Sequence, residues 1–449
     1  MKKFLLTAIV GVLVPLYCSA QENILSLREC IEWGIENNLS IKGAGQDVVK
    51  AGIGKSESRS RLLPVIQGFG NFTNNVHPGT MVTDGSGLGE LFGLDLPYMP
   101  SKSLRYATTG GLQLSMPLYD QTVYTGISIA KKVEEISGYS YGKAKEDLTV
   151  EISKLYYMGQ STAEQIRLVH DNIRRLEELK NITKAFHDNG MVLNVDVSRV
   201  SINLENLQIQ LNNLNAMYEQ QLNMLRYVID LSPETEFDLA PIREDISGGE
   251  HLLAGVSPDL YELKLLDAQE ELIQKQGKII NQGYIPSLSL VGQLSYSNFT
   301  DEFKNYFHSH QSNRWYNTTY WGLSLKVPIF DGFAKRNMAR KNNTDYHKLR
   351  FAHEDAKNKL DMQYRNSLNE WQVNSRNLQK QVDNYRLAEE VYAVTTDRYK
   401  EGVASMTELL QDELRMNEAQ INYTTALYNY MSTELGLLKL TGQLDLLTR

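Results

Sequence analysis

The chain has 449 residues, of which 42% are hydrophobic and 22% charged, a composition typical of an ordered protein and one that excludes wholesale disorder. Its formal net charge is −8 at pH 7, and no cluster of Lys and Arg interleaved with aromatic residues occurs along it. These features argue against a phosphate-binding surface, so no nucleic-acid partner is expected.

The first residues have the pattern of an export signal. Lys2 and Lys3 precede the short apolar segment 4–16, and a run of small residues ends at Ala20. Cleavage after Ala20 is therefore predicted, with acylation of Cys18 as the alternative. Past this segment no apolar run reaches the length of a transmembrane helix, so we expect an exported chain without a helical anchor.

Four segments alternate apolar residues with polar or small ones, which is the period of a β-strand with one apolar face. In segment 104–118, Leu112 and Leu114 lie on one face and Gln113 and Ser115 on the other. About ten residues with one apolar face suit a strand that crosses a bilayer with its polar face toward a lumen. The other three segments lie near 64–72, 287–296 and 321–329, and polar loops near 74–103 and 298–319 join the strands in pairs.

Aromatic residues gather near the ends of these strands, where they are expected to form girdles at the two membrane interfaces. These residues are Tyr106, Tyr119, Tyr124, Tyr284, Phe299, Tyr320, Trp321 and Phe330.

Two long stretches without proline predict very long helices. No proline occurs between Pro117 and Pro233 or after Pro328, and both stretches are rich in Leu, Glu, Gln, Lys and Asn. Seam residues recur there at steps of three and four, the pattern of helices packed side by side over a long distance. The seam residues are Leu148, Ile152, Leu155, Gly159, Thr162, Ile166, Val169, Ile173 and Leu176, then Val197, Val200, Leu204, Leu207, Leu211, Leu214, Tyr218, Gln221, Leu225 and Val228, and in the second stretch Leu409, Asp412, Met416, Ala419, Tyr423, Ala426, Tyr430, Thr433, Leu437 and Leu440.

Gly190 and Gly402 interrupt the helical pattern at equivalent places in the two stretches. The same offset along the chain separates Gly190 from Gly402 and Asp196 from Glu408. Glycine tolerates the positive φ of a helix C-cap, so each glycine is predicted to be the tip of a helical hairpin. The helix that enters Gly190 is expected to begin near Lys131, which makes it about 85 Å long.

The duplication divides the chain into two halves of the same design. After the signal peptide, residues 1–20, we predict a first structural repeat over 21–245 and a second over 246–449. Each repeat holds a helix, a strand pair and a long helical hairpin, and segment 241–259 is interpreted as a linker between them.

If the four strands lie in a membrane, they imply that several copies of the chain assemble. Four strands cannot close a barrel, and open sheet edges are not tolerated in hydrocarbon, so several chains would have to share one barrel. The alternative is a soluble sheet packed on helices.

The order of these elements resembles the TolC family of outer-membrane efflux and secretion channels, across essentially the whole mature chain. The opening LSLRECIEWGIENNLSIK is echoed by VSPDLYELKLLDAQEEL in the second half. The strand starts LLPVIQGFG and YIPSLSLVGQLSY, the strand exits MPLYD and VPIFDG, and both glycine turns follow in the same order twice.

The resemblance implies the fold and the function. The fold is a mixed α/β membrane protein in which four transmembrane β-strands per chain contribute to a shared, trimeric twelve-stranded β-barrel. The barrel continues into a long periplasmic α-helical coiled-coil barrel. The function is that of the outer-membrane channel of a tripartite efflux pump or type I secretion system in a Gram-negative bacterium, a passive duct for small molecules or polypeptides.

The same resemblance implies the partners, which are two further copies of the chain, outer-membrane lipid, a periplasmic adaptor and, through the adaptor, an inner-membrane transporter. The alternative function is that of a periplasmic coiled-coil adaptor or scaffold protein. Such a protein would normally carry one hairpin within a small β domain, rather than two hairpins with four strands.

In the family, the hairpin tips dock against the adaptor. Carried over by position, this role falls on Gly190, Met191, Gly402, Val403 and Ser405, although the two glycines can also serve only as C-caps.

The family also places a carboxylate at the narrow periplasmic aperture, and Glu408 occupies that position here. Three copies would form a ring of negative charge that favours cations, whereas a solvated surface glutamate is the alternative. The second expected carboxylate is Gln411 in this chain, and the adjacent Asp412 falls on the helix seam.

A latch that holds closed tips together in the best-known member of the family maps onto Asp196 and Tyr399. The arginine that completes that network is Ala404 here, so we expect a latch that is weaker or built differently.

Neither a catalytic site nor a cofactor site is expected. His308 and His310 are the only close histidine pair in the sequence, in a loop without an evident third ligand. No phosphate loop, nucleophile elbow or catalytic dyad is found, so the chain is predicted to have no enzymatic activity, no cofactor and no bound metal.

Overall fold

The computed structural model describes residues 24–84, 98–242, 253–307 and 314–448. The predicted signal peptide, Cys18, and the pair His308 and His310 lie outside the described residues, as do parts of the loop near 74–103 and of the linker 241–259.

The described residues form two compact units. Unit 1 takes its residues from Met1–Gly43, Gly142–Leu260 and Lys357–Arg449, and unit 2 from Ala44–Tyr141 and Tyr261–Ala356. Each unit draws on both halves of the chain, so contacts in space group the residues differently from the two predicted repeats.

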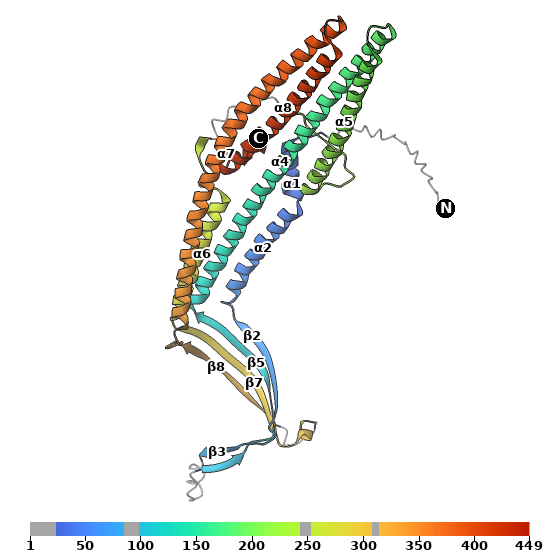
Figure 1. Cartoon of the computed structure of the whole chain (residues 1–449). Helices are drawn as coiled ribbons and strands as arrows, with labels where there is room; N and C mark the ends of the chain where they lie inside the picture. The colour runs from blue at the N-terminus through green and yellow to red at the C-terminus, as the bar shows by residue number, and fades with distance from the viewer. Residues whose placement is uncertain (1–23, 85–97, 243–252, 308–313, 449) are drawn as a thin grey trace, which may run out of the picture. The chain divides into compact units, whose positions relative to one another are not determined.

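Unit 2 contains an antiparallel sheet in the order β2-β5-β7-β8 (Figure 1). All four predicted strands are present, and they differ from the expected segments mainly at their ends. A short additional hairpin lies inside the predicted loop 74–103, where only a polar connection was expected. The strand bounds are β2 (Val65–Asn74), β5 (Tyr106–Tyr119), β7 (Ser287–Thr300) and β8 (Trp315–Lys326), and those of the additional hairpin are β3 (Thr80–Asp84) and β4 (Tyr98–Lys102).

One face of this sheet is apolar, because residues paired across neighbouring strands share a face. Leu112 pairs with Leu294, and Leu290 with Leu323. The Cβ of an alanine in place of Gly111 would collide with the Leu294 carbonyl oxygen, so β5 and β7 meet too closely there for any side chain.

The other face of the sheet is polar. Gln113 pairs with Gln293, and the Tyr320 hydroxyl donates a hydrogen bond of 3.1 Å to Gln293 Oε1. The hydroxyls of Thr109 and Ser297 lie 3.0 Å apart on the same face. The alternation in the sequence therefore predicted the two faces correctly.

The two outer strands of the sheet, β2 and β8, are its edges. Within the described residues, neither pairs with a further strand of this chain on its outer side.

Helices follow the strands in both halves of the chain. The opening helix expected as one element is two, α1 (Leu27–Asn37) and α2 (Leu39–Ser60), since Asn38 ends one and begins the other. The Asn38 N–H donates a hydrogen bond of 2.9 Å to the Gly34 carbonyl at the end of α1. The Asn38 side-chain oxygen accepts a hydrogen bond of 2.8 Å from the Ser40 N–H at the start of α2. The corresponding helix of the second half is α6 (Tyr261–Gln282).

Two helical hairpins follow, α4 (Gln121–Asp188) with α5 (Asn194–Val228), and α7 (Ala334–Lys400) with α8 (Met406–Leu440). The predicted start of α4 near Lys131 is wrong, because α4 begins directly after β5. There Asp120 Oδ1 accepts a hydrogen bond from the Thr122 N–H at 2.9 Å and caps the helix.

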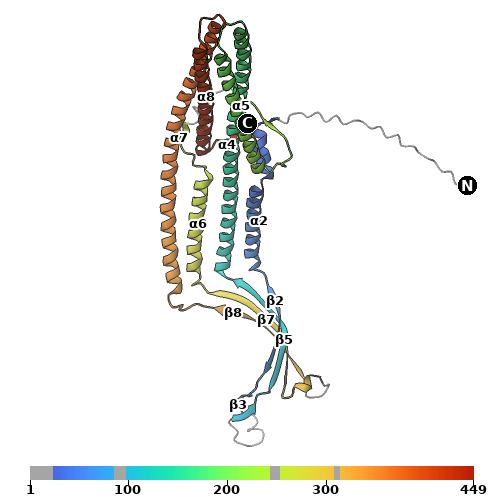
Figure 2. The same cartoon turned by 45° about the vertical axis from the view of Figure 1, so that its right-hand side comes forward.

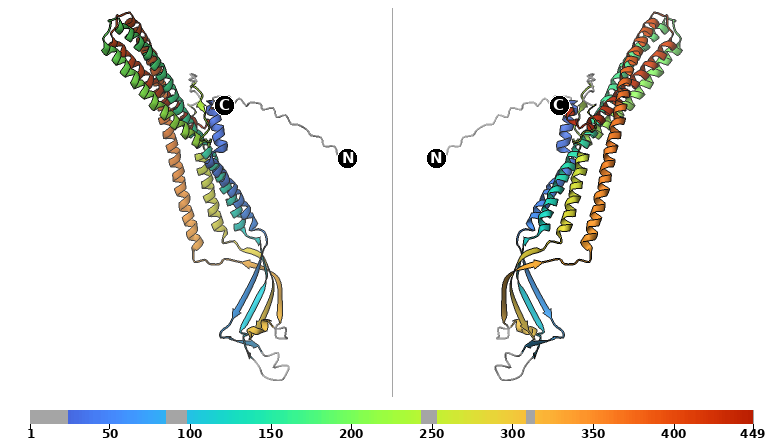
Figure 3. Two further views of the ribbon diagram at one scale, coloured as in Figure 1. Left: turned by 90° about the vertical axis from the view of Figure 1, so that its right-hand side faces the viewer. Right: turned by 90° about the vertical axis from the view of Figure 1, so that its left-hand side faces the viewer.

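In unit 1 the two hairpins lie side by side and turn at the same end (Figures 2 and 3). Their buried side chains form a core cluster that includes Leu176, Val200, Tyr399, Leu409 and Met416. The predicted seam residues are buried or partly buried in the structure, so the packing of the hairpins through this seam is confirmed.

Shorter elements complete unit 1. Two short strands, β1 (Ile24–Leu25) and β6 (Asp238–Leu239), pair in parallel. A 3-10 helix, η3 (Leu444–Thr448), follows α8. None of the described helices combines the length and the hydropathy that a membrane-spanning helix requires.

Candidate functional site at the hairpin tips

Both hairpin tips have the same backbone turn. Gly190 has φ of 73° and Gly402 φ of 75°, the left-handed conformation that glycine adopts without strain. The Met191 N–H donates to the Phe186 carbonyl at 2.8 Å, and the Val403 N–H donates to the Arg398 carbonyl at 2.8 Å. These are the hydrogen bonds of a Schellman C-cap, so the glycines are required for ending each helix.

The tips expose apolar side chains to solvent. Met191 and Val403 are each 66% exposed, and Leu193 next to the first turn is 72% exposed. Exposed apolar groups grouped at one end of a unit are typical of a surface that contacts a partner.

Glu408 lies in the first turn of α8 and is partly exposed. Its backbone N–H donates to the Ser405 hydroxyl at 3.2 Å, so Ser405 caps the helix. Its carboxylate pairs with the Arg398 guanidinium at 3.5 Å across the Gly402 turn, with about half of each side chain exposed. Arg398 was not predicted from the sequence as a partner of Glu408.

The two neighbouring aperture candidates differ in exposure. Gln411 is exposed and lines a shallow groove between α5 and α8 together with Arg199 and Leu410. Asp412 is buried in the hairpin, where it accepts a hydrogen bond of 2.8 Å from the Thr395 hydroxyl.

The two latch candidates, Tyr399 and Asp196, contact different residues. The Tyr399 hydroxyl lies 3.2 Å from the hydroxyl of Thr183 on α4, and Asp196 forms an ion pair of 3.0 Å with Arg199. Burial raises the pKa of Tyr399, the Thr183 hydrogen bond opposes this effect, and the negative charge of Asp196 adds to it.

Ala404 is buried in the part of the core cluster that contains Tyr399, which we call the tip core. The position at which the resemblance implies a latch arginine therefore holds a packed methyl group.

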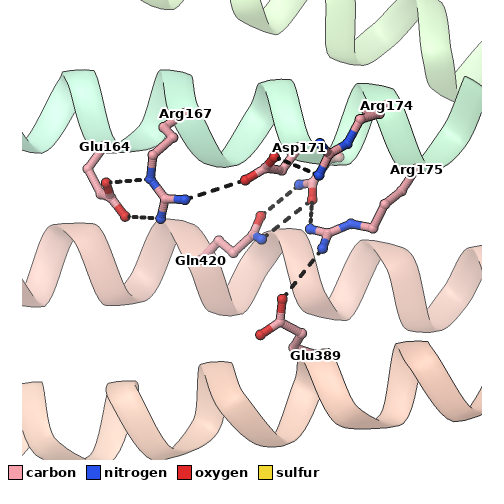
Figure 4. Close-up of polar contacts among 8 residues, drawn as sticks. Glu164, Arg167, Asp171, Arg174, Arg175, Glu389 and Gln420 are labelled. Atoms are coloured by element: carbon pink, nitrogen blue, oxygen red, sulfur yellow. Dashed lines mark hydrogen bonds and ion pairs between the residues drawn. The ribbon is translucent and has the colours of Figure 1, made fainter.

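A polar layer with a buried centre at Asn172 and Gln420 joins the hairpins farther from the tips (Figure 4). The Asn172 side chain on α4 donates to Gln420 Oε1 on α8 at 2.7 Å. Arg175 on α4 donates to Asn172 Oδ1 at 2.6 Å and pairs with Glu389 on α7 at 3.4 Å. The layer therefore connects α4, α7 and α8 through polar contacts.

Glu413 on α8 is a buried carboxylic acid that the sequence analysis missed. Its side chain is only 2% exposed, and burial raises its pKa to about 7 against the opposing charge of Arg175. Among the described residues, Arg175 Nε is buried and has no hydrogen-bond partner. The sequence feature that pointed to the burial of Glu413 was its position, directly after the predicted seam residue Asp412.

No metal site is found in the described parts of the chain, where His, Cys, Asp and Glu side chains form no cluster suited to an ion. The candidate site is therefore the surface of the two hairpin tips, which consists of the glycine turns, the Ser405 helix cap and the Arg398–Glu408 ion pair.

Comparison with known proteins agrees with this architecture. The sequence profile of the family described as outer membrane efflux protein matches residues 35–229 and 257–443. No significant match is found among curated proteins.

Several solved structures share the fold. The outer membrane protein VceC from Vibrio cholerae is 14% identical, with 93% of this chain and 96% of that chain covered and a TM-score of 0.72. The outer-membrane channel OprN is 15% identical, with coverages of 93% and 90% and a TM-score of 0.70. The open state of the MtrE outer membrane channel from Neisseria gonorrhoeae is 18% identical, with coverages of 94% and 90% and a TM-score of 0.69.

These matches span both halves of the chain and confirm the fold expected from the TolC resemblance. The family consists of channels rather than enzymes, and the adaptor alternative is not favoured. By its sequence profile and its architecture, the chain belongs to the outer membrane efflux protein family.

Proposed function

We propose that this chain forms a homotrimeric channel in the outer membrane and serves as the passive duct of a tripartite efflux pump or a type I secretion system. The observation that carries the proposal is the β2-β5-β7-β8 sheet, which has one apolar face and two outer edges that pair with no other strand in the described part of the chain. In hydrocarbon these edges must pair, so β2 of one copy joins β8 of the next. Closure of three copies gives the twelve-stranded barrel that the family resemblance implies.

The adaptor-binding surface of this channel is proposed to be formed by the hairpin tips. Met191 and Val403 follow the glycines and present largely exposed apolar side chains, which suits contact with the end of another helical hairpin. Gly190, Gly402 and Ser405 shape this surface by ending and starting the helices.

The periplasmic aperture is proposed to be lined by Glu408 and Gln411, whose side chains are exposed on α8. Three Glu408 carboxylates around a three-fold axis would attract cations and repel one another as the aperture narrows. Asp412 would reach the aperture only after repacking, because it is buried against Thr395.

The closed tips are proposed to be held by a latch centred on Tyr399. The Thr183 hydroxyl supplies its hydrogen-bonding partner and Asp196 a nearby charge. Opening would move the Gly190 and Gly402 hairpins outward, and adaptor contacts would bias that movement.

The remaining partners follow from this role. An inner-membrane transporter, reached through the adaptor, would supply the energy and choose the cargo, since the sequence contains no phosphate loop. The channel would lie in the outer membrane of a Gram-negative bacterium with its helices in the periplasm.

The proposal is tested by reconstituting the full-length protein in planar bilayers and by co-purifying its complex from cells after mild crosslinking. We expect discrete ion-conducting channels and an adaptor crosslinked to the hairpin tips. A protein that is released from membranes by alkaline washing, stays monomeric without detergent and conducts no ions would refute the proposal.

A further inference from the structure

The segment after β7 folds back onto the sheet as a short 3-10 helix, η2 (Phe303–Phe307). The Asn305 side chain donates to the Thr300 hydroxyl at 2.9 Å, and the Arg105 N–H donates to Asp301 Oδ1 at 3.1 Å. These bonds join the segment to the ends of β7 and β5, so η2 has a defined position on the sheet.

Five aromatic rings meet where η2 contacts the sheet, and we call them the η2 patch. Phe303 is central, with its ring centroid 6.1 Å from that of Phe72, 5.7 Å from Tyr106, 5.8 Å from Tyr306 and 5.6 Å from Phe307. The Thr108 hydroxyl donates to the Tyr306 hydroxyl at 2.8 Å and ties the patch to β5.

The η2 patch lies on the apolar face of the sheet. Phe72 pairs with Thr108, which lies on the same face of β5 as Leu112 because side chains alternate along a strand. The patch therefore continues the surface formed by Leu112 and Leu294, at the strand ends remote from α4 and α7.

Within a single chain the patch is open to its surroundings. Phe72 is 54%, Phe303 50% and Phe307 76% exposed. Charged groups begin immediately beside the rings, where Arg105 lies over Tyr106 at 5.3 Å and Lys304 pairs with Glu302 at 2.7 Å. Rings bordered by charges of both signs match the boundary between acyl chains and headgroups.

We propose that the η2 patch is a lipid-binding surface, occupied by outer-leaflet lipid at the level where acyl chains meet headgroups. Its phenylalanine rings would contact the upper acyl segments, while Arg105, Lys304, Asp301 and Glu302 stay among the headgroups. This inference rests on the proposed membrane position of the sheet and extends it, because η2 widens the aromatic rim beyond the strands themselves.

Site-directed spin labelling of the full-length trimer in phospholipid nanodiscs tests this proposal. Single cysteines are introduced by Phe307→Cys, Leu323→Cys and Thr73→Cys and labelled with a nitroxide, while native Cys30 is fully buried. Leu323 lies on the apolar face, and Thr73 is exposed on the opposite face beside Phe72. Collision with oxygen reports lipid, and collision with a water-soluble nickel chelate reports water.

We expect the ratio of oxygen to nickel accessibility to be high at positions 307 and 323 and low at position 73. A ratio at position 307 as low as that at position 73 would overturn the lipid site, as would a label at position 307 that neither reagent reaches, since a second subunit would then cover the patch. If position 323 also reports water, the membrane position of the sheet itself is wrong.

A second variant keeps the test independent of labelling. Phe307→Ala, at the most exposed ring of the patch, should leave the melting temperature in detergent close to that of the unchanged protein but reduce the further stabilisation gained on transfer to nanodiscs. An unchanged gain on transfer would contradict the proposal.

Discussion

The hydroxyl oxygens of Thr183 on α4 and Tyr399 on α7 lie 3.2 Å apart inside the tip core, so one buried hydrogen bond links the two hairpins close to their turns. Phe186 packs beside this pair, with its ring centroid 6.0 Å from that of Tyr399. Ala404 is buried in the same cluster as Tyr399, at the position where the TolC resemblance implies a latch arginine.

Tyr399→Phe should therefore weaken the closed tips. Loss of this neutral hydrogen bond is expected to lower the free energy of unfolding by about 1 kcal/mol and to raise the open probability of the reconstituted channel. A double-mutant cycle with Thr183→Val measures the coupling of the two hydroxyls. Tyr227→Phe, at a highly exposed tyrosine on α5, is the matched control. Strictly additive effects of the two changes would show that the hydrogen bond does not act as a latch.

Glu408→Gln should reduce cation selectivity while leaving stability nearly unchanged. The ion pair with Arg398 is half exposed, and such pairs contribute about 1 kcal/mol or less. The measurement is the reversal potential of single channels under a salt gradient, with Glu219→Gln on the exposed face of α5 as control. The same reversal potential in the variant and the unchanged channel would remove Glu408 from the aperture.

Glu413 should make stability depend on pH. Because its pKa in the folded protein is raised to about 7 from 4.5, the neutral carboxyl favours the folded state, and this contribution is complete below pH 4.5. It is lost as the pH rises toward and through about 7, when the buried group must ionise near Arg175 and Tyr392. The loss amounts to about 3–4 kcal/mol at most, at roughly 1.4 kcal/mol per pKa unit.

Glu413→Gln is expected to remove this dependence. The variant should be more stable than the unchanged protein at pH 8 and similar to it at pH 4.5, as measured by thermal unfolding across that range. Glu418→Gln, at an exposed position of the same helix, should leave the pH profile as it is. Parallel profiles of the Glu413→Gln variant and the unchanged protein would show that Glu413 titrates normally.

Two substitutions at Gly402 separate helix capping from adaptor contact. Gly402→Ala should cost about 1–2 kcal/mol, because φ is 75° and this left-handed backbone conformation is unfavourable for a residue with a Cβ atom. A clash adds nothing to this cost, since among the described residues no atom lies within 4 Å of the new methyl group. Asparagine adopts this conformation more readily, so Gly402→Asn should be nearly as stable as the unchanged protein. If the tip contacts the adaptor, the asparagine variant should still lose crosslinking to it. Full crosslinking by a stable asparagine variant would leave capping as the only role of Gly402.

Local patterns were enough to predict the main elements. Alternation in segment 104–118 identified a strand and its two faces, and Gly190 and Gly402 were recognised as the ends of long helices. The boundaries were less accurate where a single side chain decided them, as Asp120 does at the start of α4 and Asn38 does between α1 and α2.

The partners within the candidate site could not be predicted in the same way. Thr183 continues the helix seam beyond Leu176, yet its meeting with Tyr399 depends on the register between two hairpins that are far apart in the chain. The burial of Glu413 depends likewise on how α8 packs beside α4 and α7, and no short pattern records that packing.

The sequence alone determined the periods of the strands and helices, the places where the chain reverses and the two-fold repetition of the design. These properties depend on the conformational preferences of single residues and on their spacing along one element. Only the tertiary structure decided which hydroxyls, charges and rings meet, including Tyr399 with Thr183 and Phe303 with Phe72. Such contacts depend on the relative shift and rotation of packed elements, which the burial of many side chains together determines.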